Sequence, residues 1–210
     1  MRYIELKEKL KDFTVFSLSD IRRIDRDFYR RRLTEWQDKG YIRKIIRPYY
    51  LFSDLKLSEN TLFETANRIY DPSYISFESA LAYYGLIPES VYGVISATTR
   101  RTHVFKTKIG EFEYRTVAPV LFFGYNIVRY GEKCFKIAVP EKAILDYLYL
   151  NASIKNDNDF TELRINKGVF SEIINKNRVN IFLRKFRQKT LKKRMSALME
   201  FIGHARYKAD

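Results

Sequence analysis

The sequence predicts an α+β protein, with helices and a β-hairpin near the N-terminus, a mostly antiparallel sheet of about five strands in the middle, and a helical C-terminal tail. Apolar residues recur at helical spacing over residues 3–39, 140–150 and 167–205, whereas β-rich runs fill residues 41–52 and 91–139. Of the 210 residues, 46% are hydrophobic, which is enough apolar material for a sizeable core.

Two short helices are expected first. Residues 3–11 place apolar side chains between charged ones at helical spacing. The segment Ser17-Leu18-Ser19-Asp20 offers hydroxyl and carboxylate groups that can cap a helix start. A second helix is therefore predicted over about residues 18–24.

A third helix is predicted over residues 26–39, because Asp25 can cap its start and Gly40 can supply a left-handed stop. At 100° per residue, one face of this helix is apolar and the opposite face is polar. The side chains expected to face the core are Phe28, Tyr29, Leu33 and Trp36. The side chains expected to point outward from its first half are Arg30, Arg31 and Thr34, with Arg26 at the edge of that face.

A β-hairpin is predicted over residues 41–52, where two β-rich runs are separated by Arg47-Pro48. Three basic side chains are expected near its tip or on its outer face: Arg43, Lys44 and Arg47. Three helices followed by a hairpin are typical of a winged helix-turn-helix. The polar segment around residue 55 then predicts two domains, covering residues 1–55 and 56–210.

This arrangement suits DNA, because an α-helix fits the major groove and a basic hairpin can follow the neighbouring backbone. Guanidinium groups also match guanine edges and phosphate oxygens. The sequence therefore predicts double-stranded DNA as a partner, contacted by Arg26, Arg30, Arg31, Thr34, Arg43, Lys44 and Arg47. Two other interpretations stay open, since arginines on a helix are usually a solvated face and winged helices also serve as protein-interaction modules.

The charge is divided unevenly along the chain. The net charge of +14 is the sum of +6 in residues 1–56 (15 basic, 9 acidic), 0 in residues 57–150 (10 and 10) and +8 in residues 151–210 (14 and 6). Positive charge thus belongs to the two ends, which indicates particular surfaces with a polyanionic partner.

The middle of the chain predicts a sheet with helices packed on it. Residues 74–88 indicate a helix that ends at Gly85, and Pro140 begins a helix over residues 140–150. Five short strands are expected in between: Val91–Thr99, Thr102–Lys106, Phe112–Val117, Ile127–Tyr130 and Cys134–Val139.

The order of several sequence segments in this region resembles the AbiEi antitoxins of bacterial toxin–antitoxin systems. The segments are "GYIRKIIRPYYLF" (40–52), "YISFESALAYYGLIPE" (74–89), "ISATTRRTHVFKTKIGEFEYRTV" (95–117) and "IAVPEKAILDYLYL" (137–150). The resemblance covers about half of the chain, and family members usually have a glycine where Arg47-Pro48 stands here.

The resemblance implies a winged helix that binds repeats in the promoter of its own operon and represses transcription. It also implies a C-terminal domain that counters a partner toxin with a nucleotidyltransferase-like fold. As an alternative, the chain could bind the toxin or its nucleic-acid substrate without sequence-specific DNA binding. A nucleic-acid enzyme is a third, weaker interpretation.

Catalysis is not expected from the carboxylates of the middle region. Glu141 lies in the first helical turn, where it complements the helix dipole, and five residues separate it from Asp146, so the two lie on different faces. Glu78 and Glu89 form no recognisable catalytic pair. The chain also lacks a glycine-rich phosphate loop and a nucleophile elbow.

No metal, cofactor or membrane partner is expected. Neither His103 nor His204 belongs to a cluster with metal-ligand spacing, and Cys134 is expected to be a small buried strand residue. With a single cysteine and no long apolar run, the sequence predicts a cytoplasmic protein.

The C-terminal tail contains a run of eleven residues, 184–194, with seven positive charges and no negative one. This run predicts a second basic patch, which would be a solvated helix exterior, a surface for DNA phosphates beside the winged helix, or a surface for the toxin. Its members are Arg184, Lys185, Arg187, Lys189, Lys192 and Lys193.

Overall fold

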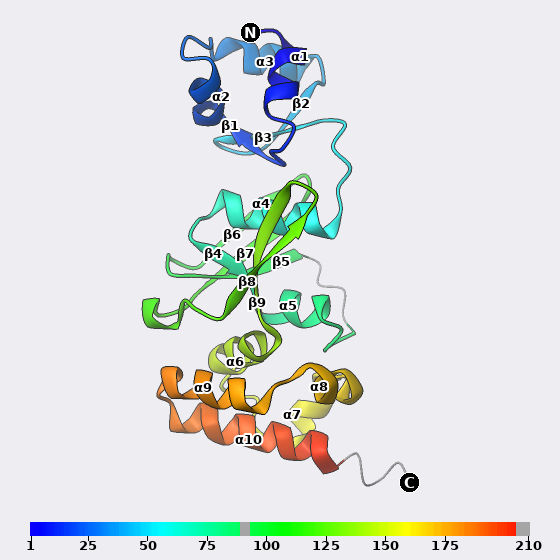
Figure 1. Cartoon of the computed structure of the whole chain (residues 1–210), viewed down its shortest axis with the longest axis vertical. Coiled ribbons are helices and arrows are strands. Elements are labelled where there is room, and N and C mark those ends of the chain that lie inside the picture. The colour runs from blue at the N-terminus through cyan, green and yellow to red at the C-terminus, as the bar shows by residue number, and fades with distance from the viewer. Residues whose placement is uncertain (89–92, 205–210) are drawn as a thin grey trace.

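The computed structural model describes residues 1–88 and 93–204 and confirms the α+β class. Three tiers follow one another along the long axis of the molecule (Figure 1). The N-terminal helices and a small sheet form one end, a larger sheet forms the middle, and the last helices form the other end.

The first tier comprises residues 1–52, here named the N-terminal unit. Its small sheet is antiparallel, with the strand order β1-β3-β2. Its elements are α1 (Tyr3–Lys9), β1 (Phe16–Ser17), α2 (Leu18–Ile24), α3 (Arg31–Asp38), β2 (Ile42–Ile46) and β3 (Tyr49–Phe52). The predicted second helix and the hairpin are confirmed, whereas the two-residue strand β1 is too short to give an alternation signal.

The N-terminal unit has its own apolar core. Leu6 of α1, Leu33 of α3 and Ile42 of β2 are almost completely buried in it, and the rings of Phe28 and Trp36 lie 5.5 Å apart. Because each helix contributes one apolar stripe, three helices and a three-stranded sheet suffice to enclose this core.

The third helix begins five residues later than predicted. After α2, Asp25 takes an extended conformation and the Phe28 amide donates to the Asp25 carbonyl, so residues 25–28 form a turn. This turn buries Phe28 and leaves Tyr29 66% exposed, so the prediction that Tyr29 faces the core was wrong. The predicted stop is confirmed, since Gly40 has a φ of +70° directly after the helix.

The second tier is a mixed sheet of six strands rather than the expected five mostly antiparallel ones, and its order is β6-β7-β5-β4-β9-β8. The pairs β5/β7 and β4/β9 are parallel, and the other three pairs are antiparallel. The strands are β4 (Ser73–Ile75), β5 (Gly93–Thr98), β6 (His103–Thr107), β7 (Gly110–Thr116), β8 (Tyr125–Tyr130) and β9 (Lys133–Ala138). The first two residues of the predicted strand Val91–Thr99, Val91 and Tyr92, lie outside the described residues.

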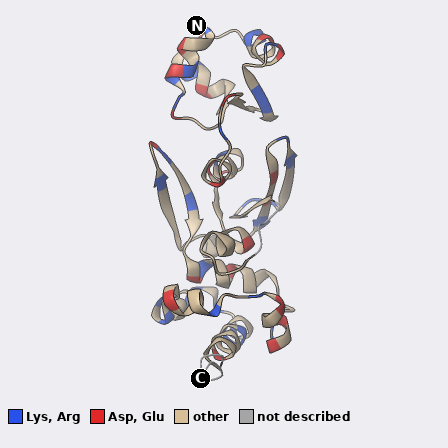
Figure 2. Cartoon of the chain, turned by 90° about the vertical axis from the view of Figure 1, so that its right-hand side faces the viewer, with Lys and Arg blue, Asp and Glu red and all other residues tan. Residues whose placement is uncertain are grey.

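Helices cover the larger sheet on both faces. The helix α4 (Glu59–Ile69) lies between the sheet and the N-terminal unit, flanked by the β6–β7 and β8–β9 hairpins (Figures 1 and 2). On the other face lie α5 (Phe77–Tyr83) and α6 (Pro140–Leu150), the latter with its predicted bounds. Tyr74 and Ile75, the first residues of the segment 74–88 predicted to form a helix, instead belong to the strand β4, and α5 begins only at Phe77.

The third tier packs against α6 at the end of the molecule opposite the N-terminal unit (Figure 1). It consists of α7 (Asp157–Glu162), α8 (Lys167–Ile173), α9 (Lys176–Phe186) and α10 (Lys189–His204). Buried side chains of these helices, such as Val179, Leu191 and Met195, join the core of the larger sheet. Within the described residues, no helix has the length and apolarity needed to cross a membrane.

Candidate nucleic-acid interface

Three consecutive arginines mark the start of α3. Arg30 is the residue that precedes the helix, and Arg31 and Arg32 occupy its first two positions. All three side chains are exposed. The first turn contains no acidic residue, and the Arg30 side chain makes no capping hydrogen bond.

This charge pattern is unfavourable for the helix itself. The N-terminus of a helix carries the positive end of the dipole, where anions stabilise and cations destabilise by about 0.3–1 kcal/mol each. Two of the arginines have partial compensation, since Arg31 lies 4.0 Å from Glu35 and Arg32 donates to the Met1 carbonyl. Arg30 has no ion-pair partner among the described residues. The start of α3 is thus a local concentration of positive charge that an external anion would neutralise.

The other predicted residues of this helix lie close to its start along the chain. Arg26 belongs to the turn between α2 and α3 and is exposed. Thr34 lies one turn into α3 and is also exposed. Tyr29, which the apolar periodicity predicted to face the core, directly precedes Arg30 and has an exposed ring.

The three predicted basic residues of the β2–β3 hairpin differ in their exposure. Lys44 and Arg47 are exposed, with Arg47 at the turn and followed by a cis peptide bond to Pro48. Arg43 differs from the expectation, because it is half-buried near the open end of the strand pair, opposite Leu51, and its Nη2 donates to the Ser53 carbonyl at 3.4 Å. Its Nε is buried without a partner among the described residues. Arg43 therefore faces the end of the hairpin strands rather than the tip.

One face of the same hairpin contacts the rest of the molecule. Ile45, Ile46 and Tyr49 are partly buried against the core of the larger sheet, which also includes Leu51. The hairpin consequently lies between the N-terminal helices and the second tier (Figure 1). Only its outer face and its turn are open to a partner.

Two polar connections fix the N-terminal unit on α4. In the first, Arg68 of α4 lies 3.0 Å from Asp20 of α2, and its guanidinium lies over the Phe13 ring at 4.5 Å. The other Asp20 oxygen accepts from the amide and hydroxyl of Ser17, at 2.8 and 2.7 Å. Burial alone would raise the pKa of Asp20, but the hydrogen bonds from Ser17 and the contact with Arg68 outweigh it, so the pKa is lowered.

The second connection centres on Glu64 of α4. Its Oε2 accepts from the Thr14 hydroxyl of the N-terminal unit and from the Tyr130 hydroxyl of β8. Lys133 adds a donor to Thr14 at 3.2 Å. Burial, with a smaller contribution from Glu64, raises the pKa of Tyr130, so this hydroxyl remains a donor at neutral pH.

The second basic patch lies at the opposite end of the molecule. Its six residues follow the end of α9, the connection and the start of α10, and all six are exposed. Blue segments in Figure 2 mark basic residues in both the N-terminal unit and these last helices. Of the interpretations left open for this patch, a surface beside the N-terminal unit does not hold, because the larger sheet separates the two (Figure 1).

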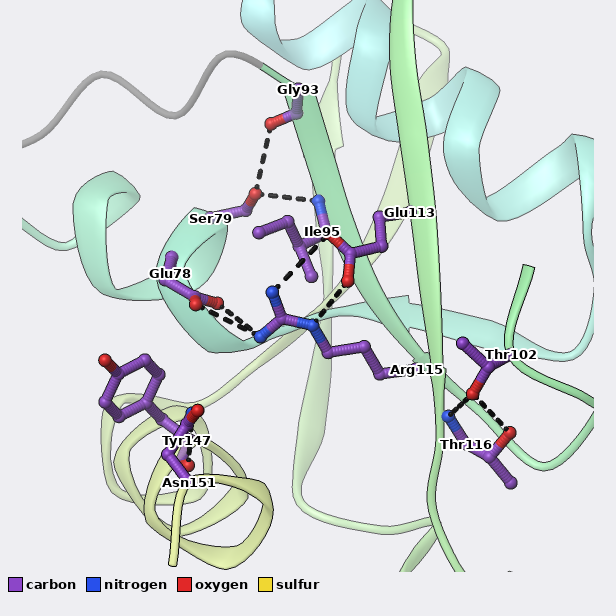
Figure 3. Close-up of polar contacts among 10 residues, drawn as sticks. All are labelled: Glu78, Ser79, Gly93, Ile95, Thr102, Glu113, Arg115, Thr116, Tyr147 and Asn151. Carbon is purple, nitrogen blue, oxygen red and sulfur yellow. Dashed lines mark hydrogen bonds and ion pairs between the residues drawn. The ribbon is translucent and has the colours of Figure 1, made fainter. Parts of the chain in front are cut away.

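Three carboxylates considered above, Glu78, Glu141 and Asp146, are each paired with a basic group. Figure 3 shows the guanidinium of Arg115 between Glu78 of α5 and Glu113 of the same strand. Its Nη1 lies 2.8 Å from Glu78, and its Nε lies 2.7 Å from Glu113. Glu89 lies outside the described residues.

A buried polar cluster connects α6 with β4, and sequence reasoning missed it. Lys142 and Asp146, one helical turn apart, form a fully buried ion pair. Asp146 also accepts from Tyr74 at 2.9 Å and Ser76 at 2.8 Å, and Lys142 donates to the Tyr74 hydroxyl at 2.8 Å. The i, i+4 spacing of Lys142 and Asp146 was the available sequence signal.

Glu141 and Asp146 point to different partners, as their spacing predicted. Glu141 is buried, accepts from the Asn175 amide at 2.9 Å, and lies 3.3 Å from Arg178 of α9. It thus connects α6 to the third tier.

Metal-ligating groups do not gather in the parts of the chain that the structure describes: no group of three His, Cys, Asp or Glu residues could hold an ion there. His103 lies 4.2 Å from the Phe105 ring. Cys134 is exposed, so the prediction of a buried cysteine was wrong. Compared with models of protein families and with curated protein sequences, the chain matches none.

Proposed function

We propose that this protein binds double-stranded DNA through its N-terminal unit, in the manner of a winged helix-turn-helix, and represses transcription of its own operon. The element order α1-β1-α2-α3-β2-β3 and the sheet order β1-β3-β2 support this proposal. In such an arrangement, α3 enters the major groove and the β2–β3 hairpin is the wing.

The observation that carries the proposal is the cluster of arginines at the start of α3. Arg30, Arg31 and Arg32 destabilise the helix start unless an anion is present, and Arg30 has no ion-pair partner among the described residues. A phosphate group placed there would accept hydrogen bonds from the guanidinium groups. Thr34, one turn further along, would then face a base edge.

The solvent exposure of the predicted DNA-contacting residues differs, and so do the contacts that we propose for them. Lys44, Arg47 and Arg26 are exposed and would contact the flanking backbone. Arg43 is removed from the proposed set of direct contacts, because its guanidinium is engaged with the Ser53 carbonyl. In its place we add Tyr29, whose exposed ring precedes Arg30.

The antitoxin role rests on the sequence resemblance to the AbiEi antitoxins. In this proposal, the larger sheet and the last helices counter a nucleotidyltransferase-like toxin encoded beside this gene. The chain itself performs no catalysis, and Glu78, Glu141 and Asp146 serve as structural ion-pair partners.

The DNA-binding proposal is tested by fluorescence anisotropy with the duplex upstream of the gene and with a scrambled duplex. The variant Arg30→Ala/Arg31→Ala should weaken binding to both duplexes and reduce the slope of log affinity against log salt by about 2 units, at about 0.9 per phosphate contact. The control is Lys9→Ala/Lys56→Ala, which removes the same charge from two exposed positions elsewhere. The proposal fails if the two variants lose affinity equally, or if the wild type does not distinguish the duplexes.

The antitoxin proposal needs a separate experiment. Co-expression with the neighbouring toxin should restore growth, and Arg30→Ala/Arg31→Ala should restore it equally well, because the counteracting surface lies outside the N-terminal unit. Failure of the wild type to restore growth would refute this role while leaving DNA binding unaffected.

A further inference from the structure

The junction between α9 and α10 forms a groove lined mainly by basic and amide side chains. Its volume is about 510 Å³. The lining residues are Asn180, Leu183, Arg184, Arg187, Gln188, Lys189 and Lys192. Four of these seven are cations and none is acidic, so the groove concentrates positive charge in a concave surface.

The basic residues of this groove have no internal neutralisation. None of Arg184, Arg187, Lys189 and Lys192 has an ion-pair partner among the described residues, although many other cations of this chain do. Arg194, two residues after Lys192, turns inward instead and donates to the carbonyls of Leu148 and Asn151. Within residues 184–194, the basic side chains that line the groove therefore point to solvent, whereas Arg194 does not.

The local helix geometry makes this charge unfavourable for the free protein. The first turn of α10 contains Lys189 and Lys192 and no acidic residue, although the positive end of the helix dipole lies there. Lys189 and Lys193 are also like charges at i, i+4. Arg187 takes the left-handed conformation, with a φ of +54°, at the end of α9, where glycine is the usual residue. A bound polyanion would relieve the two electrostatic costs, at the helix start and between the like charges.

The lining indicates phosphate groups rather than an acidic protein. Protein interfaces have an apolar or aromatic centre, whereas nucleic-acid interfaces are polar and strongly positive. Here the only apolar lining residue is Leu183, and it is half-buried. Asn180 and Gln188 contribute amide donors, which also suit phosphate and sugar oxygens.

A neighbouring hollow extends the surface along α10. It shares Lys189 and Lys192 with the groove and adds Lys193 and Ser196, with Glu200 at its far end. Because the shared lysines lie between the two hollows, successive phosphates of one chain could contact them in turn.

We infer that the α9–α10 groove is a second nucleic-acid site, which binds the phosphodiester backbone without sequence preference. It lies at the opposite end of the molecule from the N-terminal unit, with the larger sheet between them (Figure 1). It therefore contacts a different nucleic-acid segment from the one that α3 contacts. This inference does not depend on the proposed function, because the groove would bind whether or not α3 does.

The test uses a chain in which Arg30→Ala/Arg31→Ala has removed the proposed α3 contacts. In this background, the groove variant carries Arg184→Gln, Arg187→Gln, Lys189→Gln and Lys192→Gln. The matched control removes the same charge from four exposed cations elsewhere: Lys9→Gln, Arg101→Gln, Lys108→Gln and Lys155→Gln. Anisotropy is measured with a single-stranded RNA, a random-sequence DNA duplex and a poly-glutamate peptide, between about 50 and about 200 mM salt.

The groove variant should lose about 3 to 4 units of salt slope on the duplex, and about 3 units on the single strand, while the control loses much less. A further variant with Lys189→Arg and Lys192→Arg should retain binding, which separates charge from folding effects. If the groove variant loses more affinity for the RNA than for the duplex, the groove prefers an RNA backbone, and the reverse result indicates a DNA backbone.

Two results would overturn the inference. Equal losses in the groove variant and in the control would mean that only net charge matters. Tighter binding of poly-glutamate than of either nucleic acid at equal charge would assign the groove to an acidic protein.

Discussion

Asp20 joins two parts of the molecule through one carboxylate. One oxygen caps the start of α2 by accepting from Ser17, and the other contacts Arg68 of α4. Since these partners lower its pKa, the ionised form is favoured in the folded protein relative to the unfolded chain. The carboxylate thus stabilises both the helix start and the attachment of the N-terminal unit.

The contribution of ionised Asp20 should be visible in the pH dependence of the free energy of unfolding. Because the folded pKa of Asp20 lies below its unfolded value of about 3.9, its contribution is present above that value and is lost as the pH falls through the folded pKa. The free energy of unfolding, measured by urea titration from neutral pH down to about pH 3, should fall less steeply in Asp20→Asn than in the wild type. Identical pH profiles would show that Asp20 is not coupled to folding.

The buried pair Lys142–Asp146 provides a second prediction for single residues. Burial raises the pKa of Asp146 and lowers that of Lys142, so each is tolerated only beside the other. Asp146→Asn should reduce the free energy of unfolding by about 3–5 kcal/mol, because Lys142 then remains buried without a counter-charge. Urea unfolding measures this loss.

A double variant provides the control. Lys142→Met/Asp146→Leu removes both charges and should be more stable than Asp146→Asn. If the double variant were less stable than Asp146→Asn, the buried unpaired Lys142 would not be the source of the loss, and the argument from desolvation would be wrong.

The helix α3 is the element in which stability and the proposed function oppose each other. Its start carries arginines where acidic residues would be stabilising. Arg30→Asp should therefore raise the free energy of unfolding by up to about 1 kcal/mol and, at the same time, weaken DNA binding. Thermal unfolding and anisotropy on the same sample test both effects, and a variant that lost both stability and binding would contradict this account of α3.

The elements that the sequence predicts well are those whose ends depend on local chemistry. The Ser17–Asp20 capping box determines the start of α2, and Pro140 determines the start of α6, so both helices have the predicted bounds. The predicted start of α3 was wrong. Tyr29 continues the apolar spacing of the helix in sequence, but the chain turns at residues 25–28 before the helix begins. The parallel pairing of β4 with β9 joins Ile75 to Ile137 and has no local signal.

In the candidate site too, the sequence predicts the features that depend on local structure and misses those that depend on long-range packing. Helical spacing predicts the outward direction of Arg30, Arg31 and Thr34 because their exposure depends on one helix. The position of the second basic patch depends on how the third tier packs against α6, which is a long-range property. The half-buried state of Arg43 likewise depends on packing, since its partner Ser53 lies beyond the hairpin.

At the scale of the whole molecule, the attachment of the N-terminal unit determines how bound DNA would be oriented relative to the larger sheet. The segment between β3 and α4, residues 53–58, has no helix or strand, so the polar contacts of α4 and the buried face of the hairpin maintain the arrangement. Two domains joined only by a linker would instead move independently.

Limited proteolysis should detect the loss of this attachment. Lys56 is an exposed trypsin site within the linker. Glu64→Ala/Arg68→Ala removes both polar connections and should increase the rate of cleavage after Lys56 several-fold, whereas Lys155→Ala should leave that rate unchanged. An unchanged cleavage rate in the double variant would show that apolar contacts alone maintain the arrangement.

The central claim, that the first half of α3 meets the duplex, is tested most directly by photocross-linking. A benzophenone amino acid replaces Thr34 in one protein and exposed Lys155, which lies between α6 and α7, in another. Each is irradiated with labelled duplex from upstream of the gene, at a salt concentration that suppresses non-specific binding. The account predicts a cross-link from position 34 and little from position 155, whereas a cross-link from position 155 without one from position 34 would contradict it.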